Sequence, residues 1–469
     1  MAEQSILYRR IRPSVGAGFA VLLAVLLSAC ASIGRPDLQR LYASSQSAAD
    51  QPPVILIPGI MGSRLANANG DEVWIGSVGK LLTSSYRQLA LPVPGQPQPA
   101  NPALHATRLT DKLAGRDFYA SIERILTEAG GYQRGEAGVK VPSGRRSYYE
   151  FAYDWRQDMV DSAGELGALI DQIRLDHGDP NLQVDIIAHS MGGLVARYYL
   201  RYGGDDVLDD NAFPLTYAGA GRVRRLALLG TPNLGSISSL HSFIQGERLG
   251  LGRLPTEALS TFPSVYQLFP HPLNDWIMSN TGAPLDRDLF DVALWKELHW
   301  SIFDSNTKAR ILKQFADPDS GQAYYLALVD NFQRRLERAR RFVWSLTVPL
   351  VQSPWNLRVF GGDCTLTPAR IVVEDEAGDA RVRLRPQDIE HPLAGVDYDA
   401  LMLEPGDGAV TKASLLARQS LNPAIPRHRY SFFRVEGEMF LCERHDQLST
   451  NITFQDNLLN YLLTRDLNP

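Results

Sequence analysis

The sequence of 469 residues has few cysteines, little excess charge and, beyond its N-terminal segment, no long apolar run. Its three cysteines include no Cys-x-x-Cys pair and its nine histidines no His-x-x-x-His pair, so it indicates neither a metal site nor a cofactor. The formal net charge of -5 gives no bias toward nucleic acid. With 44% hydrophobic and 21% charged residues, the chain has the composition of a globular protein with a sizeable core.

The N-terminal segment has the pattern of an export signal. Three arginines precede the short apolar run FAVLLAVLL (Phe19 to Leu27), and small residues follow it. The run is too short for a comfortable transmembrane helix, so a cleaved signal is favoured over an uncleaved anchor. No later stretch is long and apolar enough to span a bilayer.

The letters LSAC at the end of this segment resemble a bacterial lipobox, whose cysteine becomes the lipidated first residue of the mature protein. We therefore expect a signal peptide over residues 1–29, a lipid anchor on Cys30 and a tether over 30–51. Ala31 stands where an aspartate would resemble an inner-membrane retention signal. The expected location is thus the cell envelope, at the outer membrane and facing the periplasm.

Short apolar strands alternate with helical patterns through much of residues 52–469. This alternation is typical of a mostly parallel sheet covered by helices on both faces, with active sites at the carboxyl ends of the strands. From about 236 to 345 the strand signals stop, and helical spacing predicts a cap insertion over that end. The expected strands include Val54–Ile57, Val184–Ala188, Arg225–Leu229, Leu357–Phe360 and Phe432–Val435.

A serine stands at the corner between an expected strand and the next helix, in the stretch AHSMG (Ala188 to Gly192). A nucleophilic serine on such a turn needs small residues two positions before and after it, usually as G-x-S-x-G. Alanine in the first small position meets the same steric need. The pattern and its context predict that Ser190 is a nucleophile rather than a polar residue in a tight turn.

A nucleophilic serine also needs a base and an orienting acid, which in this arrangement follow it in the order acid, histidine. His445 follows the last expected strand and so lies at its carboxyl end, whereas His428 precedes that strand. We therefore predict that His445 is the base.

Three aspartates are candidates for the acid. Asp446 adjoins the base and cannot easily face its imidazole. Asp407 lies between two glycines in GDG, where the backbone exposes a carboxylate in a turn, and Asp363 lies in GGDC. Residue type alone leaves these two nearly even.

The reaction also needs two backbone N–H groups that stabilise an oxyanion, one after the nucleophile and one in the loop after an early strand. Met191 provides the first. In IPGIMGS the second is expected from Ile60, because Gly59 and Gly62 let that backbone approach the site.

Six motifs occur in order along the chain: PVILIPGIMGSRL, YDWR, AHSMGG, GTPNLGS, GDGAV and the histidine in CERHDQLSTN. Together they resemble the lecithin:cholesterol acyltransferase family, which includes a lysosomal phospholipase with transacylase activity. The resemblance spans about Pro53 to Leu463 and implies an α/β-hydrolase fold, with Ser190, Asp407 and His445 as nucleophile, acid and base.

The resemblance also implies a disulfide between Cys364 and Cys442, because animal members have one near the acid and an exported protein permits it. It departs from those members in having no cysteine between Cys30 and Cys364, so the early loop around Trp74 is expected to differ.

The expected function is that of a serine esterase acting on lipid acyl esters through an acyl-enzyme, as a lipase, phospholipase or O-acyltransferase. The alternative is a non-catalytic lipid-binding envelope lipoprotein that keeps the hydrolase fold. The expected partners are the lipid acyl-ester substrate and a membrane surface reached through the anchor, with no nucleic acid.

Overall fold

The computed structural model describes residues 35–47, 51–76, 84–96, 103–110, 112–113, 116–117, 119–249, 252–350, 354–376, 379–418 and 433–464. The expected signal peptide, Cys30 and His428 lie outside these residues. None of the helices in the described part has the length and apolar character needed to cross a membrane.

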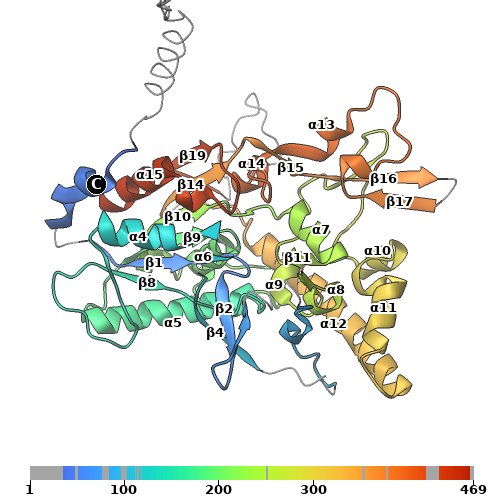
Figure 1. Ribbon diagram of the computed structural model, residues 1–469, viewed down its shortest axis with the longest axis horizontal. Coiled ribbons are helices and arrows are strands. Elements are labelled where there is room, and N and C mark those ends of the chain that lie inside the picture. The colour runs from blue at the N-terminus through green and yellow to red at the C-terminus, as the bar shows by residue number, and fades with distance from the viewer. Residues whose placement is uncertain are drawn as a thin grey trace, which may run out of the picture.

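A seven-stranded sheet forms the centre of the molecule (Figure 1). Its strands are β1 (Val54–Ile57), β7 (Gln133–Arg134), β8 (Ser147–Glu150), β9 (Val184–His189), β10 (Val223–Leu229), β14 (Asn356–Gly362) and β19 (Gly437–Leu441). They lie in the order β19-β14-β10-β9-β1-β8-β7, and every neighbouring pair is parallel. All four residues of β1 are fully buried, which explains why such strands are continuous apolar runs in the sequence.

Helices cover both faces of this sheet and create two cores. Ile55 and Ile57 belong to one core, while Val54 and Leu56 belong to the other, since successive side chains of a strand point to opposite faces. The fold is therefore the α/β-hydrolase fold that the sequence predicted. The first core includes α5 (Met159–His177) and α6 (Met191–Tyr202), and the second includes α4 (Ala120–Glu128) and α15 (Ile452–Leu463).

The last strand of the sheet differs from the sequence prediction. The expected strand at 432–435 was wrong, because the edge strand is β19, which pairs with β14 from Arg358↔Gly437 to Gly362↔Leu441. Phe433 is buried elsewhere, with the Arg197 guanidinium 4.9 Å from its ring centre. Its apolar character therefore reflects contact with a buried cation rather than a place in the sheet.

Part of the expected tether packs on this body. Residues 38–47 form α2 (Leu38–Tyr42) and the 3₁₀ turn η1 (Ala43–Ser47). Leu38 is buried in the core that holds α4 and α15, and the Tyr42 hydroxyl donates to a carboxylate oxygen of Asp456 at 2.8 Å. The polar composition of this segment concealed the contact, because one leucine and one tyrosine are enough to dock two short turns.

The cap comes from two separate stretches of chain. The expected insertion at 236–345 is mainly helical, but its strand β13 (Ile277–Ser279) pairs in parallel with β16 (Ile371–Glu376), which pairs with β17 (Asp379–Arg383). Figure 1 shows this hairpin beside the cap helices, far from α4 and α15. Local sequence patterns did not indicate this pairing, because the partner strand of β16 comes from Ile277–Ser279, far earlier in the chain. The cap helices are α7 (Ile237–Gln245), α8 (Thr256–Leu259), α9 (Pro263–Tyr266), α10 (Val292–Glu297), α11 (Ser305–Leu312) and α12 (Pro318–Ser345).

Smaller elements complete the described part. A three-stranded sheet joins β2 to β3 and β4, and three two-stranded sheets join β5 to β6, β11 to β12 and β15 to β18. These elements are β2 (Ser63–Asn67), β3 (Glu72–Trp74), β4 (Leu104–Leu109), β5 (Lys112–Leu113), β6 (Arg116–Asp117), β11 (Glu247–Leu249), β12 (Gly252–Leu254), β15 (Thr365–Pro368), β18 (Leu403–Gly406), α13 (Tyr398–Met402) and α14 (Lys412–Leu415).

Candidate active site

Ser190 occupies a sharp turn between β9 and α6. Its φ of 53° and ψ of -125° lie outside the regions that L-residues ordinarily adopt. The two following glycines are needed for close packing: a Cβ on Gly192 would lie 2.4 Å from the Pro58 carbonyl oxygen, and a Cβ on Gly193 only 2.0 Å from Thr231 Oγ1. This is the strained turn that lifts a serine hydroxyl clear of the backbone.

Ser190, His445 and Asp407 form one hydrogen-bonded chain at the carboxyl end of the sheet. The distance from Ser190 Oγ to His445 Nε2 is 3.0 Å, and that from His445 Nδ1 to Asp407 Oδ2 is 2.7 Å. The backbone N–H of His445 also donates to the Asp407 carbonyl oxygen at 2.9 Å. The three residues come from loops after β9, β18 and β19, so only the folded chain brings them together.

Gly230, in the GTPNLGS motif after β10, leaves the space in which the histidine and the acid meet. Its φ is +56°, and a Cβ there would lie 2.8 Å from His445 Nδ1 and 3.0 Å from Asp407 Oδ2. This motif therefore contributes room rather than a reacting group.

The electrostatics of the pair favour the charges that proton transfer needs. Burial by itself lowers the pKa of His445, but the Asp407 carboxylate outweighs this and raises the pKa above its ordinary value. Burial would raise the pKa of Asp407, yet His445 and the backbone N–H groups of Val410 and Ala409 lower it below its usual range. Asp407 is 2% exposed, so it stays an ionised partner buried behind the imidazole.

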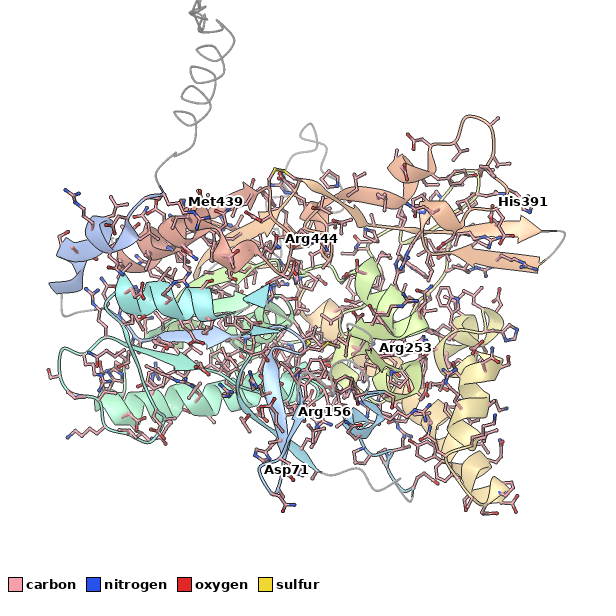
Figure 2. The ribbon with its side chains drawn as sticks, in the orientation of Figure 1. Asp71, Arg156, Arg253, His391, Met439 and Arg444 are labelled. Atoms are coloured by element: carbon pink, nitrogen blue, oxygen red, sulfur yellow. A yellow bond between two sulfur atoms is a disulfide. The ribbon has the colours of Figure 1, made fainter. Side chains whose placement is uncertain are left out.

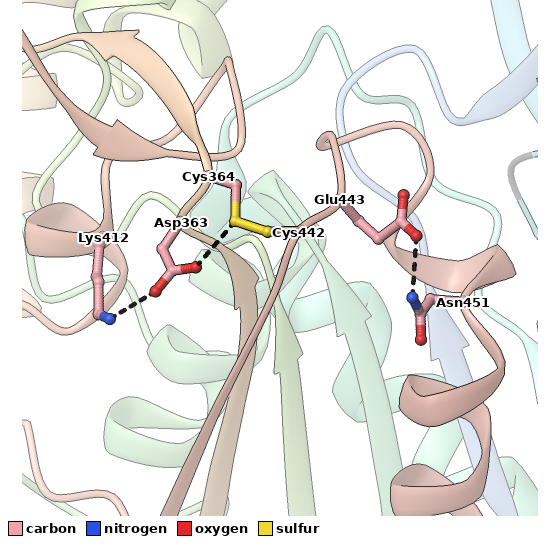
Figure 3. The surroundings of a disulfide bond; sticks show 6 residues. All are labelled: Asp363, Cys364, Lys412, Cys442, Glu443 and Asn451. Atoms are coloured by element: carbon pink, nitrogen blue, oxygen red, sulfur yellow. Dashed lines mark hydrogen bonds and ion pairs between the residues drawn. A yellow bond between two sulfur atoms is a disulfide. The ribbon is translucent and has the colours of Figure 1, made fainter.

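Asp363, the other candidate acid, does not face the imidazole. Figure 3 shows its carboxylate beside the disulfide, where Oδ2 accepts from Lys412 Nζ at 2.8 Å. The disulfide joins Cys364, two residues after the end of β14, to Cys442, the residue after β19, and the two Cα atoms lie 4.9 Å apart. Asp363 thus belongs to the crosslinked loop pair beside the site. Asp446 lies 3.8 Å from Arg444 in a weak ion pair.

The loop after β1 carries Ile60, the expected second oxyanion donor. Ile60 lines the same cavity as Ser190. A Cβ on Gly59 would lie 2.7 Å from Ser190 Cβ, so the loop passes close to the nucleophile only because this residue is glycine. Met191 is the first residue of α6, where N–H groups have no acceptor within the helix.

Tyr119 and His189 hold this loop in place, and the sequence patterns indicated neither residue. The Gly59 N–H donates to Tyr119 Oη at 2.8 Å, and Tyr119 Oη lies 3.0 Å from His189 Nδ1. Burial, with a smaller contribution from His445, lowers the pKa of His189 to about 3, so its ring is neutral. His189 was visible within AHSMGG, but no pattern connects it to a tyrosine 70 positions earlier.

A cavity of about 280 Å³ opens at Ser190 and His445. Its walls combine apolar side chains with a row of serines from the start of α7. The remaining lining residues are Ile60, Met61, Pro232, Leu259, Val265, Leu268, Ala409, Val410, Ser236, Ser238, Ser239, Ser242 and Glu247. The apolar part is suited to an acyl chain and the serine row to hydroxyl or ester oxygens.

Within the described ranges, no group of three or more histidine, cysteine, aspartate or glutamate side chains is arranged to hold a metal ion.

The fold and the site define this protein as an α/β hydrolase, and comparison with known proteins agrees with that class. Residues 132–333 match the family model of lecithin:cholesterol acyltransferase. The matched part includes Ser190 and most of the cap but neither Asp407 nor His445. It confirms the resemblance to this family that the motifs predicted. A search of curated protein sequences found no match.

Among solved structures, the chain is similar to one in the crystal structure of the Tle4–Tli4 complex, with 16% identity, a TM-score of 0.54 and coverage of 88% of this chain and 98% of that one. It also matches the mature form of the Bacillus licheniformis lipase BlEst2, with 13% identity, a TM-score of 0.32 and coverage of 88% and 93%. Lipase 1 from Pelosinus fermentans matches with 12% identity, a TM-score of 0.33 and coverage of 89% and 100%.

Proposed function

We propose that this protein is a serine enzyme that cleaves lipid acyl esters through an acyl-enzyme and passes the acyl group to water or to an alcohol. The observation that carries the proposal is the continuous chain from Ser190 Oγ through His445 to Asp407 at the edge of a partly apolar cavity. The family match supports an acyl-ester reaction in general.

In the proposed reaction, Ser190 Oγ attacks the ester carbonyl carbon while His445 Nε2 takes the hydroxyl proton. Asp407 holds the imidazole through Nδ1 and stabilises the imidazolium. The backbone N–H groups of Ile60 and Met191 donate to the oxyanion. When the carbonyl re-forms, the ester C–O bond breaks, the departing alcohol takes the proton from Nε2, and the acyl group stays on Ser190.

The second half repeats these steps with a new nucleophile. Water or an alcohol gives its proton to His445 Nε2 and attacks the acyl carbon, and Ser190 Oγ leaves with the proton returned. Hydrolysis and transfer use the same groups, so acceptor choice depends on which hydroxyl reaches the cavity. We assign both outcomes to one site.

Ser190→Ala tests the proposal against the alternative of a lipid-binding protein without catalysis. The purified protein is incubated with mixed phospholipids and neutral glycerides, with and without an added alcohol, and the fatty acids and new esters are identified. We expect release or transfer of acyl groups by the native protein and none by Ser190→Ala. Lipid binding without turnover by a folded native protein would favour the alternative.

We also propose that a lipid on Cys30 anchors the protein at the outer membrane, which would keep the site beside its substrate. Cells expressing Cys30→Ala are labelled with palmitate and fractionated. We expect loss of the label and of membrane retention in the variant. Unchanged labelling and retention would overturn this anchor without bearing on the chemistry at Ser190.

A further inference from the structure

A second cavity, of about 670 Å³, lies in the cap next to the catalytic cavity. Ser242 and Glu247 line both, so the two cavities share a wall. The second one differs in charge because four guanidinium groups line it. They are Arg248, Arg253, Arg310 and Arg385, and Figure 2 labels Arg253 in this part of the cap.

Two of these arginines face each other. Arg248 and Arg253 are directly opposed in the register of the β11–β12 hairpin, a position in which like charges repel. Arg253 donates to the Gln245 carbonyl oxygen, which carries no full charge. No carboxylate among the described residues forms an ion pair with Arg248. The hairpin therefore holds two positive charges together at the edge of the cavity.

The third arginine is only partly neutralised. Arg310 lies 3.1 Å from the buried Glu257 carboxylate, but Arg87 lies 3.6 Å from the same carboxylate. Two guanidinium groups thus share one negative charge, so the cluster of Arg310, Arg87 and Glu257 keeps a net positive charge.

The fourth arginine lies near a buried histidine that lacks a partner. His241 of α7 is 7% exposed, and its Nε2 has no hydrogen-bond partner among the described residues. Burial, followed by the positive charge of Arg385, lowers the pKa of His241 to about 4. The unpaired ring nitrogen of a lining residue is a polar atom for which the chain itself provides no bond.

Two carboxyl groups also line the cavity, fewer than its four guanidinium groups. Asp304 caps α11, where its Oδ1 accepts from the Thr307 N–H at 2.8 Å. Burial raises the pKa of Glu247, while a hydrogen bond from Ser242 lowers it, and the net direction is upward. Glu247 therefore carries its charge less readily than an exposed glutamate.

We propose that this cap cavity binds the phosphate of a lipid headgroup while the acyl ester of the same lipid lies at Ser190. The arginines would give charge-assisted hydrogen bonds to the phosphate oxygens, and the shared wall at Ser242 and Glu247 places headgroup and ester in neighbouring cavities. The proposal rests on the proposed function and adds to it a preference for headgroups with a net negative charge.

The test compares the native protein with the double variant Arg248→Gln/Arg385→Gln on short-chain lipids dissolved as monomers. The substrates are dihexanoyl-phosphatidylglycerol, dihexanoyl-phosphatidylcholine and the uncharged dihexanoylglycerol. We expect the variant to lose about tenfold in kcat/KM on the phosphatidylglycerol, mainly through KM, and to keep its rate on dihexanoylglycerol. Arg124→Gln is a control for the loss of a positive charge outside the cap, since it lies in α4 on the body and should change none of the three rates.

Monomeric substrates separate this site from general attraction to a charged surface. An effect of the double variant that occurs only on vesicles of phosphatidylglycerol would overturn the proposal in favour of surface electrostatics. An equal loss on all three monomeric lipids would also overturn it, because the two arginines would then act on the common ester chemistry.

Inorganic phosphate provides a readout that does not depend on turnover. Calorimetric titration should detect phosphate binding to the native protein that weakens in the double variant and at high salt. If the native protein cleaves no ester yet binds phosphate in this way, the function proposed for Ser190 fails while the anion site stands. If phosphate binding depends on the arginines but the native protein shows no preference for phosphatidylglycerol, the ligand of the cavity would be free phosphate. That result would overturn the proposal.

Discussion

Replacing Tyr119 by Phe removes an oxygen that joins the loop after β1 to His189, the residue before Ser190. Tyr119 is 1% exposed, and its Oη accepts from Gly59 N–H at 2.8 Å and meets His189 Nδ1 at 3.0 Å. A phenylalanine ring fills the same space but leaves the Gly59 N–H and the His189 ring nitrogen without partners. Each buried group left unpaired costs about 1–3 kcal/mol, so for these two groups we expect the free energy of unfolding to fall by about 2–6 kcal/mol.

The same change should slow catalysis, because Ile60 directly follows Gly59. Loss of an oxyanion donor costs about 10²–10³ in kcat, and a donor that is loosened rather than lost should cost about tenfold. We expect KM on a soluble ester to change little, since Tyr119 does not line the catalytic cavity.

The measurements are kcat on a soluble acyl ester and urea unfolding at the same temperature. Tyr202→Phe is the matched control, because its buried hydroxyl donates to the Ser345 carbonyl oxygen at 2.7 Å away from the loop. It should lose stability with unchanged kcat. If Tyr119→Phe also lost only stability, the loop would not depend on the Tyr119 hydroxyl for its catalytic geometry. If Tyr119→Phe kept its stability, the bonds from Tyr119 Oη to Gly59 and His189 would not be formed.

Three further predictions concern the same site. Asp407→Asn should cut kcat by about 10⁴ in a folded protein. Asp363→Asn loses the contact with Lys412, so it should lower the melting temperature with little change in kcat. The reverse pattern would move the role of the acid to Asp363. Because Asp407 raises the pKa of His445 above 6.5 and only the neutral imidazole accepts the Ser190 proton, kcat/KM should rise with pH through a pKa above that value. The residual activity of Asp407→Asn should rise at lower pH than in the native protein, and an unshifted profile would contradict the pairing. The double variant Cys364→Ser/Cys442→Ser removes a crosslink between residues 78 positions apart. It should lower the free energy of unfolding, measured in urea, by about 4 kcal/mol. Two titratable thiols in the unfolded, unreduced native protein would show that no bridge forms.

The sequence alone located four strands of the central sheet (β1, β9, β10 and β14) and the turn at Ser190, because these depend on local patterns. Val54–Ile57 is a run of four apolar residues, and such a run must be buried on both faces. The small residues around Ser190 are a steric requirement of one turn, so the letters AHSMGG were enough to locate it.

Only the tertiary structure decided which groups meet across long sequence separations. Asp363 and Asp407 both follow late strands, and no local rule separates them. The structure separates the two aspartates, because Asp407, after β18, contacts His445, whereas Asp363, after β14, contacts Lys412 beside the disulfide. The family resemblance had favoured Asp407, but the residue types had not.

The same reason explains what the sequence left out entirely. Tyr119 meets His189 across 70 positions, and the β11–β12 hairpin and α11 bring Arg248 and Arg310 to one cavity from different parts of the cap. Each of these residues is ordinary in its own stretch: Tyr119 precedes a helix, Arg248 lies in a short strand and Arg310 lies in a helix. Their chemistry comes from proximity, and proximity between distant segments is created by packing, which a single sequence does not display.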